Sequence, residues 1–466
     1  MNSKNILLRT GLWYTISNFI SQGIVFLCTP IFTRILTKAD FGEFNNFVAI
    51  LNIFVIVLTL NLDATYISAK RDFEDEDNYL STVLKMSSVT VLIGVVLCAV
   101  FQKGICKLLC IKPLYLWLML VYIFFYPAIT LLLAKARFRF KYIQYIVLNS
   151  GLGLVSTILA ILLVCNLEDA LLGRILGYVV PTIVVGVICY VYILLQGKKV
   201  NYDMCKYALR IGLPYIPHLL SMTFLNFVDR IMITKMCNED ATAIYSLGYT
   251  CATIIVVLMT SYNSAFSPWL AKKLEQNAED IKKISYQYII CFLIPVFGVL
   301  LLVPELILIL GGPEYTDAVT VALLVSVGVI FQFIYTMYVN IEQYYKQTIG
   351  MAVASVVAAI LNLVLNYIFI PLYGYQVAAA TTLVGYMVLL ILHMLLVRRI
   401  GKNRLYPTGK IIITAIFVLI MMVFVAFLYQ FMWLRYMIAF IYFLVIFVYV
   451  LTRRLKGDSN VRFLQK

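Results

Sequence analysis

Long apolar runs, separated by short polar and basic segments, make up most of this chain. The hydrocarbon core of a membrane is about 30 Å thick, so each helical crossing needs roughly 20 apolar residues. Only 13% of the residues are charged and 63% are hydrophobic, which leaves too little polar surface for a water-soluble domain. We therefore expect about fourteen membrane-spanning helices, at residues 11–35, 44–68, 83–102, 113–134, 142–166, 171–195, 211–236, 241–269, 284–309, 318–341, 349–370, 375–397, 410–430 and 434–452.

Two features predict an all-α integral membrane bundle. Residues 347–397 hold no Asp, Glu, Lys or Arg and are too long for one crossing, so the turn from Pro371 to Gly374 is expected to split them. The runs do not alternate polar and apolar residues, as the strands of a membrane β-barrel do. Because lipid offers an exposed backbone no hydrogen-bond partners, helices are the remaining way to span it.

The distribution of Lys and Arg predicts how the chain is oriented. With the N-terminus in the cytoplasm, 28 of the 37 Lys and Arg residues fall on the cytoplasmic side, eight on the other side, and Arg230 inside a span. Cytoplasmic loops of membrane proteins carry an excess of these residues. We therefore expect an even number of crossings and both termini in the cytoplasm.

Composition also narrows the classes of function. Basic loops facing anionic lipid account for the net charge of +15, so no nucleic-acid partner is expected. The ten cysteines form no CxxC pair, and the histidines, His218 and His393, are far apart in the sequence. We expect no metal site, no cofactor and no catalytic residues, hence no enzyme.

A short internal repeat predicts the domain organisation. Residues 9–14, Arg-Thr-Gly-Leu-Trp-Tyr, match residues 210–215, Arg-Ile-Gly-Leu-Pro-Tyr, at four of six positions. Both segments begin spans of the same orientation, and six crossings separate them, as in parallel repeats. We expect two six-helix lobes around a central cleft, residues 1–200 and 201–400, with two additional helices and a cytoplasmic tail in residues 401–466.

Charged residues within an apolar span are the first candidates for a functional site. Asp229 and Arg230 stand together in the seventh span, and Asn226 and His218 lie within about 60° of Asp229 on a helical wheel. We expect this stripe to line the cleft, with Arg230, Asn226 and His218 contacting substrate and Asp229 acting as a gate or ion-coupling residue. The alternative is a fixed Asp–Arg pair that joins two helices.

The first and sixth spans supply further candidates for the cleft. Asn18 and Gln22 are one turn apart in a polar stripe of the first span, and Arg34 follows at its outer end. Arg174 opens the sixth span from the same side. These four residues are predicted to contact substrate; interhelical hydrogen bonding is the alternative for the two amides.

Two acidic residues complete the set of gate or ion-coupling candidates. Asp63 lies in the second span toward its cytoplasmic end. Glu342 stands near the inner end of the tenth span, four residues before Lys346, with which it is spaced to pair. Pro214 and Pro217 are expected to bend the inner end of the seventh helix.

Several segments resemble the signatures of the polysaccharide-biosynthesis flippases. Residues 29–42 resemble their first-helix pattern, with Pro30, then Thr-Arg-x-Leu, then Asp40 before Phe-Gly. Residues 229–233 resemble their Asp-Arg-x-x-Ile pattern, and residues 243–246 resemble Gly-Ile/Leu-Tyr-Ser with Ala243 in place of Gly. Further matches, which extend the resemblance in order over nearly the whole chain, lie at residues 266–269, 362–366 and 370–374, although Val377 replaces a customary Gly.

The chain is thus similar to the Wzx-type exporters of O-antigen, capsule and teichuronic acid, in the MATE-like superfamily that also contains the lipid II flippase. The resemblance implies alternating-access transport of undecaprenyl-pyrophosphate-linked oligosaccharide from the inner to the outer leaflet of the bacterial cytoplasmic membrane. It implies this glycan and membrane lipid as partners, with a polysaccharide polymerase and a chain-length regulator as further candidates. Arg34, Arg174 and Arg230 are expected to neutralise the pyrophosphate, because guanidinium suits bidentate phosphate binding.

Other functions of similar chains stay open. A MATE-type ion-coupled exporter of drugs or metabolites would need a compact acidic pocket at mid-membrane, whereas Asp63 and Asp229 are predicted near opposite membrane surfaces. A membrane-embedded glycan polymerase or ligase would need a sizeable external loop with acidic or His residues, which the spacing of the spans does not provide. A scaffold of the same fold that transports nothing is a third alternative.

Overall fold

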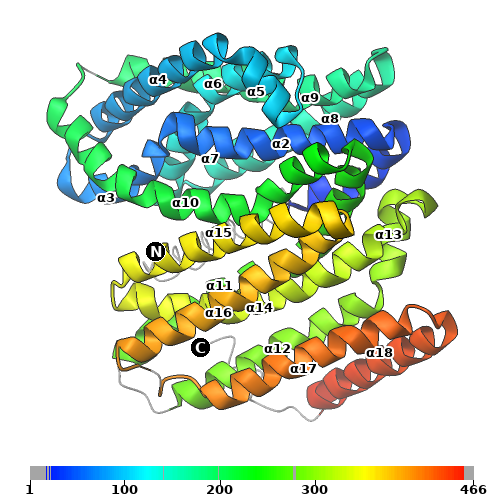
Figure 1. Cartoon of the computed structure of the whole chain (residues 1–466). Helices are drawn as coiled ribbons and strands as arrows, with labels where there is room; N and C mark the ends of the chain where they lie inside the picture. The colour runs from blue at the N-terminus through cyan, green and yellow to red at the C-terminus, as the bar shows by residue number, and fades with distance from the viewer. Residues whose placement is uncertain are drawn as a thin grey trace.

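The computed structural model describes residues 17, 20, 22–139, 141–197, 199–275, 280–402 and 404–455, and every regular element in these ranges is a helix (Figure 1). Among the described residues, twelve helices are long and apolar enough to cross a membrane, α10 adds a bent thirteenth, and Gln22–Ile35 is a shorter apolar helix. The all-α membrane bundle is therefore confirmed, and about fourteen crossings agree with this count. The first copy of the repeat, residues 9–14, and Asn18 lie outside the described residues.

After the helix Gln22–Ile35, the first half of the chain contains α2 (Lys38–Thr59), the 3₁₀ turn η1 (Leu62–Thr65), α3 (Tyr66–Asp72), α4 (Glu76–Val100), α5 (Gln102–Leu109), α6 (Pro113–Phe138), α7 (Tyr142–Ile146), the π-helical turn η2 (Val147–Gly151), α8 (Leu152–Asn166) and α9 (Ala170–Gln196).

The second half contains α10 (Tyr202–Met236), α11 (Glu239–Glu275), α12 (Ile281–Leu301), α13 (Val303–Gly311), the 3₁₀ turn η3 (Pro313–Tyr315), α14 (Ala318–Tyr344), α15 (Thr348–Tyr373), α16 (Val377–Arg399), α17 (Thr408–Leu428) and α18 (Met432–Leu455).

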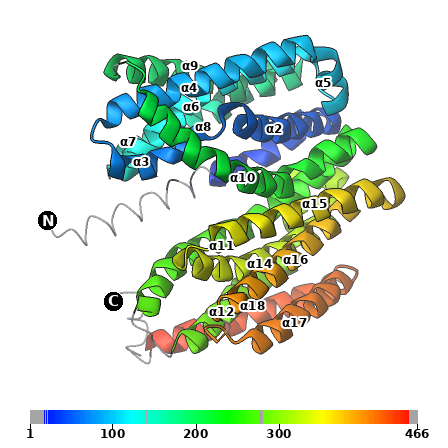
Figure 2. The ribbon, with the colours of Figure 1, turned by 60° about the vertical axis from the view of Figure 1, so that its left-hand side comes forward.

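The two halves of the chain meet mainly along α2, which contacts both α10 and α11. In Figure 1 the helices up to α9 occupy the upper part of the view, and α11 to α18 occupy the lower part. The last two helices, α17 and α18, pack on α12, and Figure 2 shows all three at the edge away from α4. We call the end of the bundle where α6 ends and α10 begins the basic end, and the other the opposite end.

Side-chain caps explain where several helices begin. The side chains of Thr37, Asp75 and Asp169 each accept a hydrogen bond from the backbone N–H three residues later, at the starts of α2, α4 and α9. Asn201 caps α10 in the same way, accepting from the N–H groups of residues 203 and 204. These caps satisfy N–H groups that have no partner inside the helix, so the chain turns tightly between crossings.

Small residues bring neighbouring helices close together. At the contact between α8 and α9, a Cβ atom added to Gly177 would stand 2.2 Å from the Cα atom of Ala160. The two backbones touch there without intervening side chains, which is how helices gain packing contacts in lipid.

Two predicted spans are broken in the structure. The second span, expected over 44–68, ends at Thr59 because Leu60 and Asn61 adopt left-handed conformations with φ of 52° and 47°. Such conformations stop a helix and are uncommon for a residue like Leu. Asp63 consequently lies in η1, beyond the membrane-spanning helix. The ninth span, expected over 284–309, is divided into α12 and α13 at Leu302.

The bend predicted for the seventh span is confirmed. The segments Tyr202–Pro214 and Ile216–Met236 of α10 meet at an angle of 45°. Pro214 and Pro217 cause the bend, because proline lacks an N–H group and its ring clashes with the preceding turn.

Candidate functional site

A polar cavity lies between the first half of the chain and α10, at the basic end. Its volume is about 620 Å³, and Ala64, Ser68 and Arg137 on its wall are exposed, so it opens to the surface. We call it the Asp63 cavity. Its wall consists of Asn61, Asp63, Ala64, Thr65, Ser68, Thr130, Leu133, Ala134, Arg137, Tyr145, Ile211, Gly212 and Leu219.

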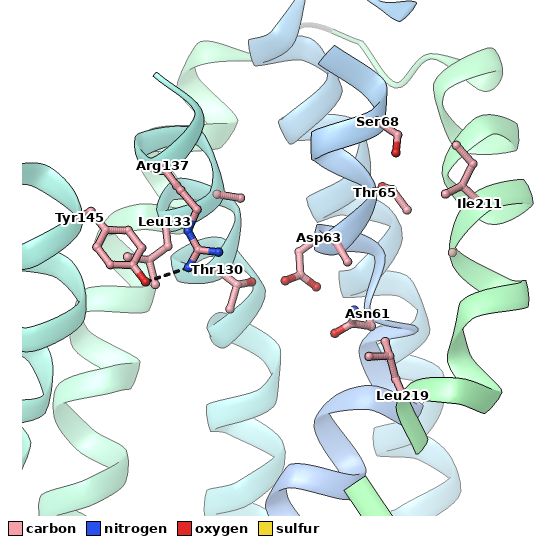
Figure 3. Close-up of a pocket in the computed structure, with 13 residues that line it drawn as sticks. Asn61, Asp63, Thr65, Ser68, Thr130, Leu133, Arg137, Tyr145, Ile211 and Leu219 are labelled. Atoms are coloured by element: carbon pink, nitrogen blue, oxygen red, sulfur yellow. Dashed lines mark hydrogen bonds between the residues drawn. The ribbon is translucent and has the colours of Figure 1, made fainter. Parts of the chain in front are cut away.

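The break after α2 and the last turns of α6 supply the polar groups of the cavity. Figure 3 shows Asn61 and Asp63 on one wall, facing Thr130 and Arg137 on α6. One guanidinium nitrogen of Arg137 donates a hydrogen bond of 2.8 Å to the hydroxyl of Tyr145 in α7. The cavity thus offers a carboxylate, a guanidinium, an amide and hydroxyl groups to a ligand that enters from the basic end.

Sequence reasoning identified one residue of this cavity, Asp63, and missed Asn61, Thr130, Arg137 and Tyr145. Arg137 belongs to a run of four cations that the sequence treats as a single cytoplasmic segment, residues 135–141. On a helix, residues 135 and 139 share one face and residue 137 lies on the other. This helical spacing is the signal that could have distinguished Arg137 from the neighbouring cations.

The opposite end is closed by contacts between the two halves. The hydroxyl of Thr33 donates to the carbonyl of Leu310 at 2.5 Å, and the ammonium of Lys38 lies 3.5 Å from the carboxylate of Glu314. Arg34 is exposed and donates to the carbonyl of Ile309 at 3.2 Å, at the C-terminal end of α13, where a cation is favoured.

Arg174 holds three helices together at the same end. Its guanidinium carbon lies 3.6 Å from the ring centroid of Phe32 and 4.3 Å from that of Phe44. A cation between two aromatic faces is stabilised by both rings. In this conformation Arg174 lies outside the Asp63 cavity, and Gln22 is exposed on the helix Gln22–Ile35.

Asp229 lies in a closed polar cluster and is not on the wall of the Asp63 cavity, and the expectation that its stripe lines the cleft stays a prediction. Its carboxylate is fully buried and accepts hydrogen bonds from Tyr245 at 2.5 Å, Asn366 at 2.6 Å and Thr382 at 2.8 Å. The donors come from α11, α15 and α16, which enclose α10 at this level. Three neutral donors thus stabilise a carboxylate away from solvent.

The neighbours of Asp229 on α10 have different surroundings. Arg230 is 9% exposed, donates to the carbonyl of Asn226 at 2.6 Å and lies 4.6 Å from the ring centroid of Tyr249. The side chain of Asn226 accepts a hydrogen bond of 3.2 Å from Tyr386. These contacts differ from the fixed Asp–Arg pair, since Arg230 contacts a carbonyl and an aromatic face.

Glu342 pairs with His393, not with Lys346 as the spacing predicts. The Nδ1 atom of His393 lies 2.9 Å and 3.0 Å from the two carboxylate oxygens, and both side chains are buried. Tyr335 stacks on the imidazole with ring centroids 5.4 Å apart. Lys346 takes a left-handed conformation just beyond α14, so helical i, i+4 geometry does not apply to it. His218 is close enough to His393 to interact with it electrostatically.

Comparison with known proteins relates this arrangement to membrane transporters. The family model described as "Polysaccharide biosynthesis protein" matches residues 7–274, and the MatE model matches residues 214–368. An uncharacterized membrane protein of Haemophilus influenzae is 24% identical over 64% of this chain and 74% of its own length. A probable low-salt glycan biosynthesis flippase of Haloferax volcanii, Agl15, is 26% identical over 36% of this chain and 37% of its own.

Solved structures share the fold. The lipid II flippase MurJ in an inward closed conformation superposes with a TM-score of 0.72 at 15% identity, over 95% of this chain and 99% of that chain. The MATE multidrug transporter DinF-BH gives a TM-score of 0.60 at 15% identity, over 87% and 97% of the two chains.

Proposed function

Because the chain belongs to the polysaccharide biosynthesis protein family, we propose that it is a flippase for undecaprenyl-pyrophosphate-linked oligosaccharides. It carries the glycan head group from the inner to the outer leaflet of the bacterial cytoplasmic membrane. Both termini face the cytoplasm in this proposal, so the basic end is the cytoplasmic end and the Asp63 cavity receives substrate from the inner leaflet.

The observation that carries the proposal is the combination of a polar cavity at one end and closure at the other. A charged head group cannot cross hydrocarbon without a polar path. The Asp63 cavity offers polar groups at the basic end, and the contacts of Thr33 and Lys38 close the opposite end. Alternating access requires these contacts to open while the basic end closes.

Arg137 is the cation that meets the pyrophosphate first in this proposal. Among the described residues, it is the one Lys or Arg on the wall of the Asp63 cavity. A guanidinium binds phosphate oxygens through two parallel hydrogen bonds. Arg34, Arg174 and Arg230 take over after the opposite end opens, when their present contacts with carbonyls and rings separate.

The acidic groups are proposed to couple transport to an ion. Asp229, in its cluster of hydroxyl and amide groups, and Glu342, paired with His393, are buried carboxyl groups inside the second half of the chain. Buried charges cost several kcal/mol unless they are paired or serve transport. Binding of a cation or proton at either site would favour one of the two conformations.

A reconstituted transport assay tests the proposal. Proteoliposomes carry a polyprenyl-pyrophosphate-linked oligosaccharide labelled with a fluorophore on the glycan, and dithionite added outside destroys the label in the outer leaflet. The protein should speed the loss of protected label, and Arg137→Gln should slow this loss about tenfold or more, since one charge-assisted contact is removed. Arg137→Lys should retain part of the rate.

The matched control is Lys272→Gln, at the exposed basic end of α11, which should keep the wild-type rate. If liposomes with the wild-type protein lost protected label no faster than liposomes without protein, the proposed function would be contradicted. Equal rates for wild type and Arg137→Gln would contradict the role of Arg137 alone.

Export of an organic cation is the second candidate, because Asp63 places a carboxylate in the same cavity. Rhodamine uptake into inverted vesicles, lost on Asp63→Asn and retained on Arg137→Gln, would favour that function over glycan transport.

A further inference from the structure

A second cavity at the basic end faces outward from the bundle. It has a volume of about 420 Å³ and lies between the end of α6, the turn from α7 to η2, and α9. Lys135, Arg139 and Lys141 contribute to its wall. We call it the lateral pocket. None of its described wall residues lines the Asp63 cavity, so the two cavities are separate.

The run of four cations at residues 135–141 is divided between the two cavities. Arg137 lies on the wall of the Asp63 cavity, and the other three cations lie on the wall of the lateral pocket. The fold thus separates Arg137 from the three neighbouring cations. The sequence alone treats them as one basic loop.

The lateral pocket retains an excess of positive charge. Lys135 pairs with Asp77, and Arg139 pairs with Glu76 at 3.0 Å. Lys141 is exposed and makes no ion pair or hydrogen bond through its side chain with any described residue. One uncompensated ammonium and one exposed guanidinium therefore stand at the mouth of the pocket, where an anion would complete the charge balance.

Apart from Gln144, the rest of the pocket wall is apolar, and part of it is exposed on the outer surface of the bundle. Ile143, Val147 and Tyr192 on its wall are 63%, 65% and 48% exposed. Val147 begins the π-helical turn η2, which widens the helix beside the pocket. A ligand that fits this wall has an apolar chain below an anionic group.

We propose that the lateral pocket binds one anionic phospholipid of the leaflet at the basic end. Its phosphate lies against Lys141 and Arg139, and an acyl chain follows Ile143, Val147 and Tyr192. Basic pockets between membrane helices bind anionic lipid head groups, because each cation near the surface contributes to the attraction. A free phosphate ion would satisfy the charge and leave the apolar wall uncovered, so the lipid is the better match. The site is independent of the transported substrate.

Native mass spectrometry of the delipidated full-length protein tests this assignment with dioleoyl phosphatidylglycerol and dioleoyl phosphatidylcholine as probes. We expect one phosphatidylglycerol to bind more tightly than phosphatidylcholine. Lys141→Gln should weaken phosphatidylglycerol binding about fivefold, the effect of one interfacial cation. Lys141→Arg should restore it.

Arg137→Gln and Lys272→Gln are the controls, because they remove a cation at the same end without touching the lateral pocket. Both should bind phosphatidylglycerol as the wild type does. Equal affinity for the two lipids, or wild-type affinity in Lys141→Gln, would overturn the proposal. Displacement of the lipid by inorganic phosphate would show a free-anion site instead, and preferential exchange for undecaprenyl phosphate would show a substrate-lipid site.

Discussion

Gly42 of α2 lies so close to Glu239 of α11 that a Cβ atom added to the glycine would stand 1.9 Å from the carbonyl oxygen of Glu239. The two helices belong to different halves of the chain and meet at the opposite end. The closed state of that end therefore requires a residue without a side chain at position 42.

Replacement of this glycine should open the opposite end. Gly42→Val adds an isopropyl group whose Cβ atom would overlap the backbone of Glu239, so the closed contacts of the two halves are disfavoured. We expect a single cysteine at Thr33, in a cysteine-free background, to react faster with a thiol reagent than in the parent. Gly104→Val, at a position with open space around the added Cβ, is the control and should leave the rate unchanged. Unchanged labelling in Gly42→Val would argue against a gate at this contact.

The charge distribution predicts which end faces the cytoplasm. Gly409 is exposed near the start of α17 at the basic end, and Thr316 is exposed beside η3 at the opposite end. In intact cells, an impermeant thiol reagent should label Thr316→Cys and should label Gly409→Cys only after permeabilisation. The reverse pattern would invert the proposed orientation.

Glu342 and His393 should behave as one energetic unit. Removing either partner leaves a polar or charged group buried alone, so Glu342→Gln and His393→Gln should each destabilise the protein by about 3 kcal/mol. The double variant should lose less than the sum, by about 1 kcal/mol or more. Denaturation in detergent measures the cycle. Lys346→Gln should change stability by less than about 0.5 kcal/mol, and strict additivity would exclude coupling of Glu342 with His393.

The hydrogen-bond donors around Asp229 should favour a carboxylate over an amide at this position. Asp229→Asn directs an NH₂ group at hydroxyl and amide donors, so we expect a loss of about 1–3 kcal/mol in stability. Tyr245→Phe removes one of the three donors and should cost less. Thermal unfolding in detergent measures both changes. Asp317→Asn, at an exposed position, is the control. If Asp229→Asn lost no more stability than Asp317→Asn, the cluster would not require a carboxylate.

Sequence patterns predicted the fold well because they depend on local chemistry. The length of each apolar run is set by membrane thickness, and the bend of α10 follows directly from Pro214 and Pro217. The family resemblance rests likewise on local motifs, such as residues 29–42.

The site was harder to predict because it depends on which residues the folded chain brings together. Glu342 has a local partner in sequence, Lys346, but its structural partner stands 51 residues away. The left-handed conformation of Leu60, which moves Asp63 out of the span, has no signal in the residue type. Helical spacing alone places Arg137 on a different face of α6 from Lys135 and Arg139. Which of the two faces lines a cavity became known only from the structure.

The division of the cations at residues 135–141 between two cavities constrains evolutionary change in this segment. Inserting or deleting one residue within α6 before Lys135 would rotate the side chains of Lys135 and Arg137 by about 100° around the helix. Both residues would keep their charge, yet their side chains would no longer face the cavities that they line now. Homologous chains should therefore exchange residues freely between Arg and Lys at the outward positions while keeping the length of this segment constant.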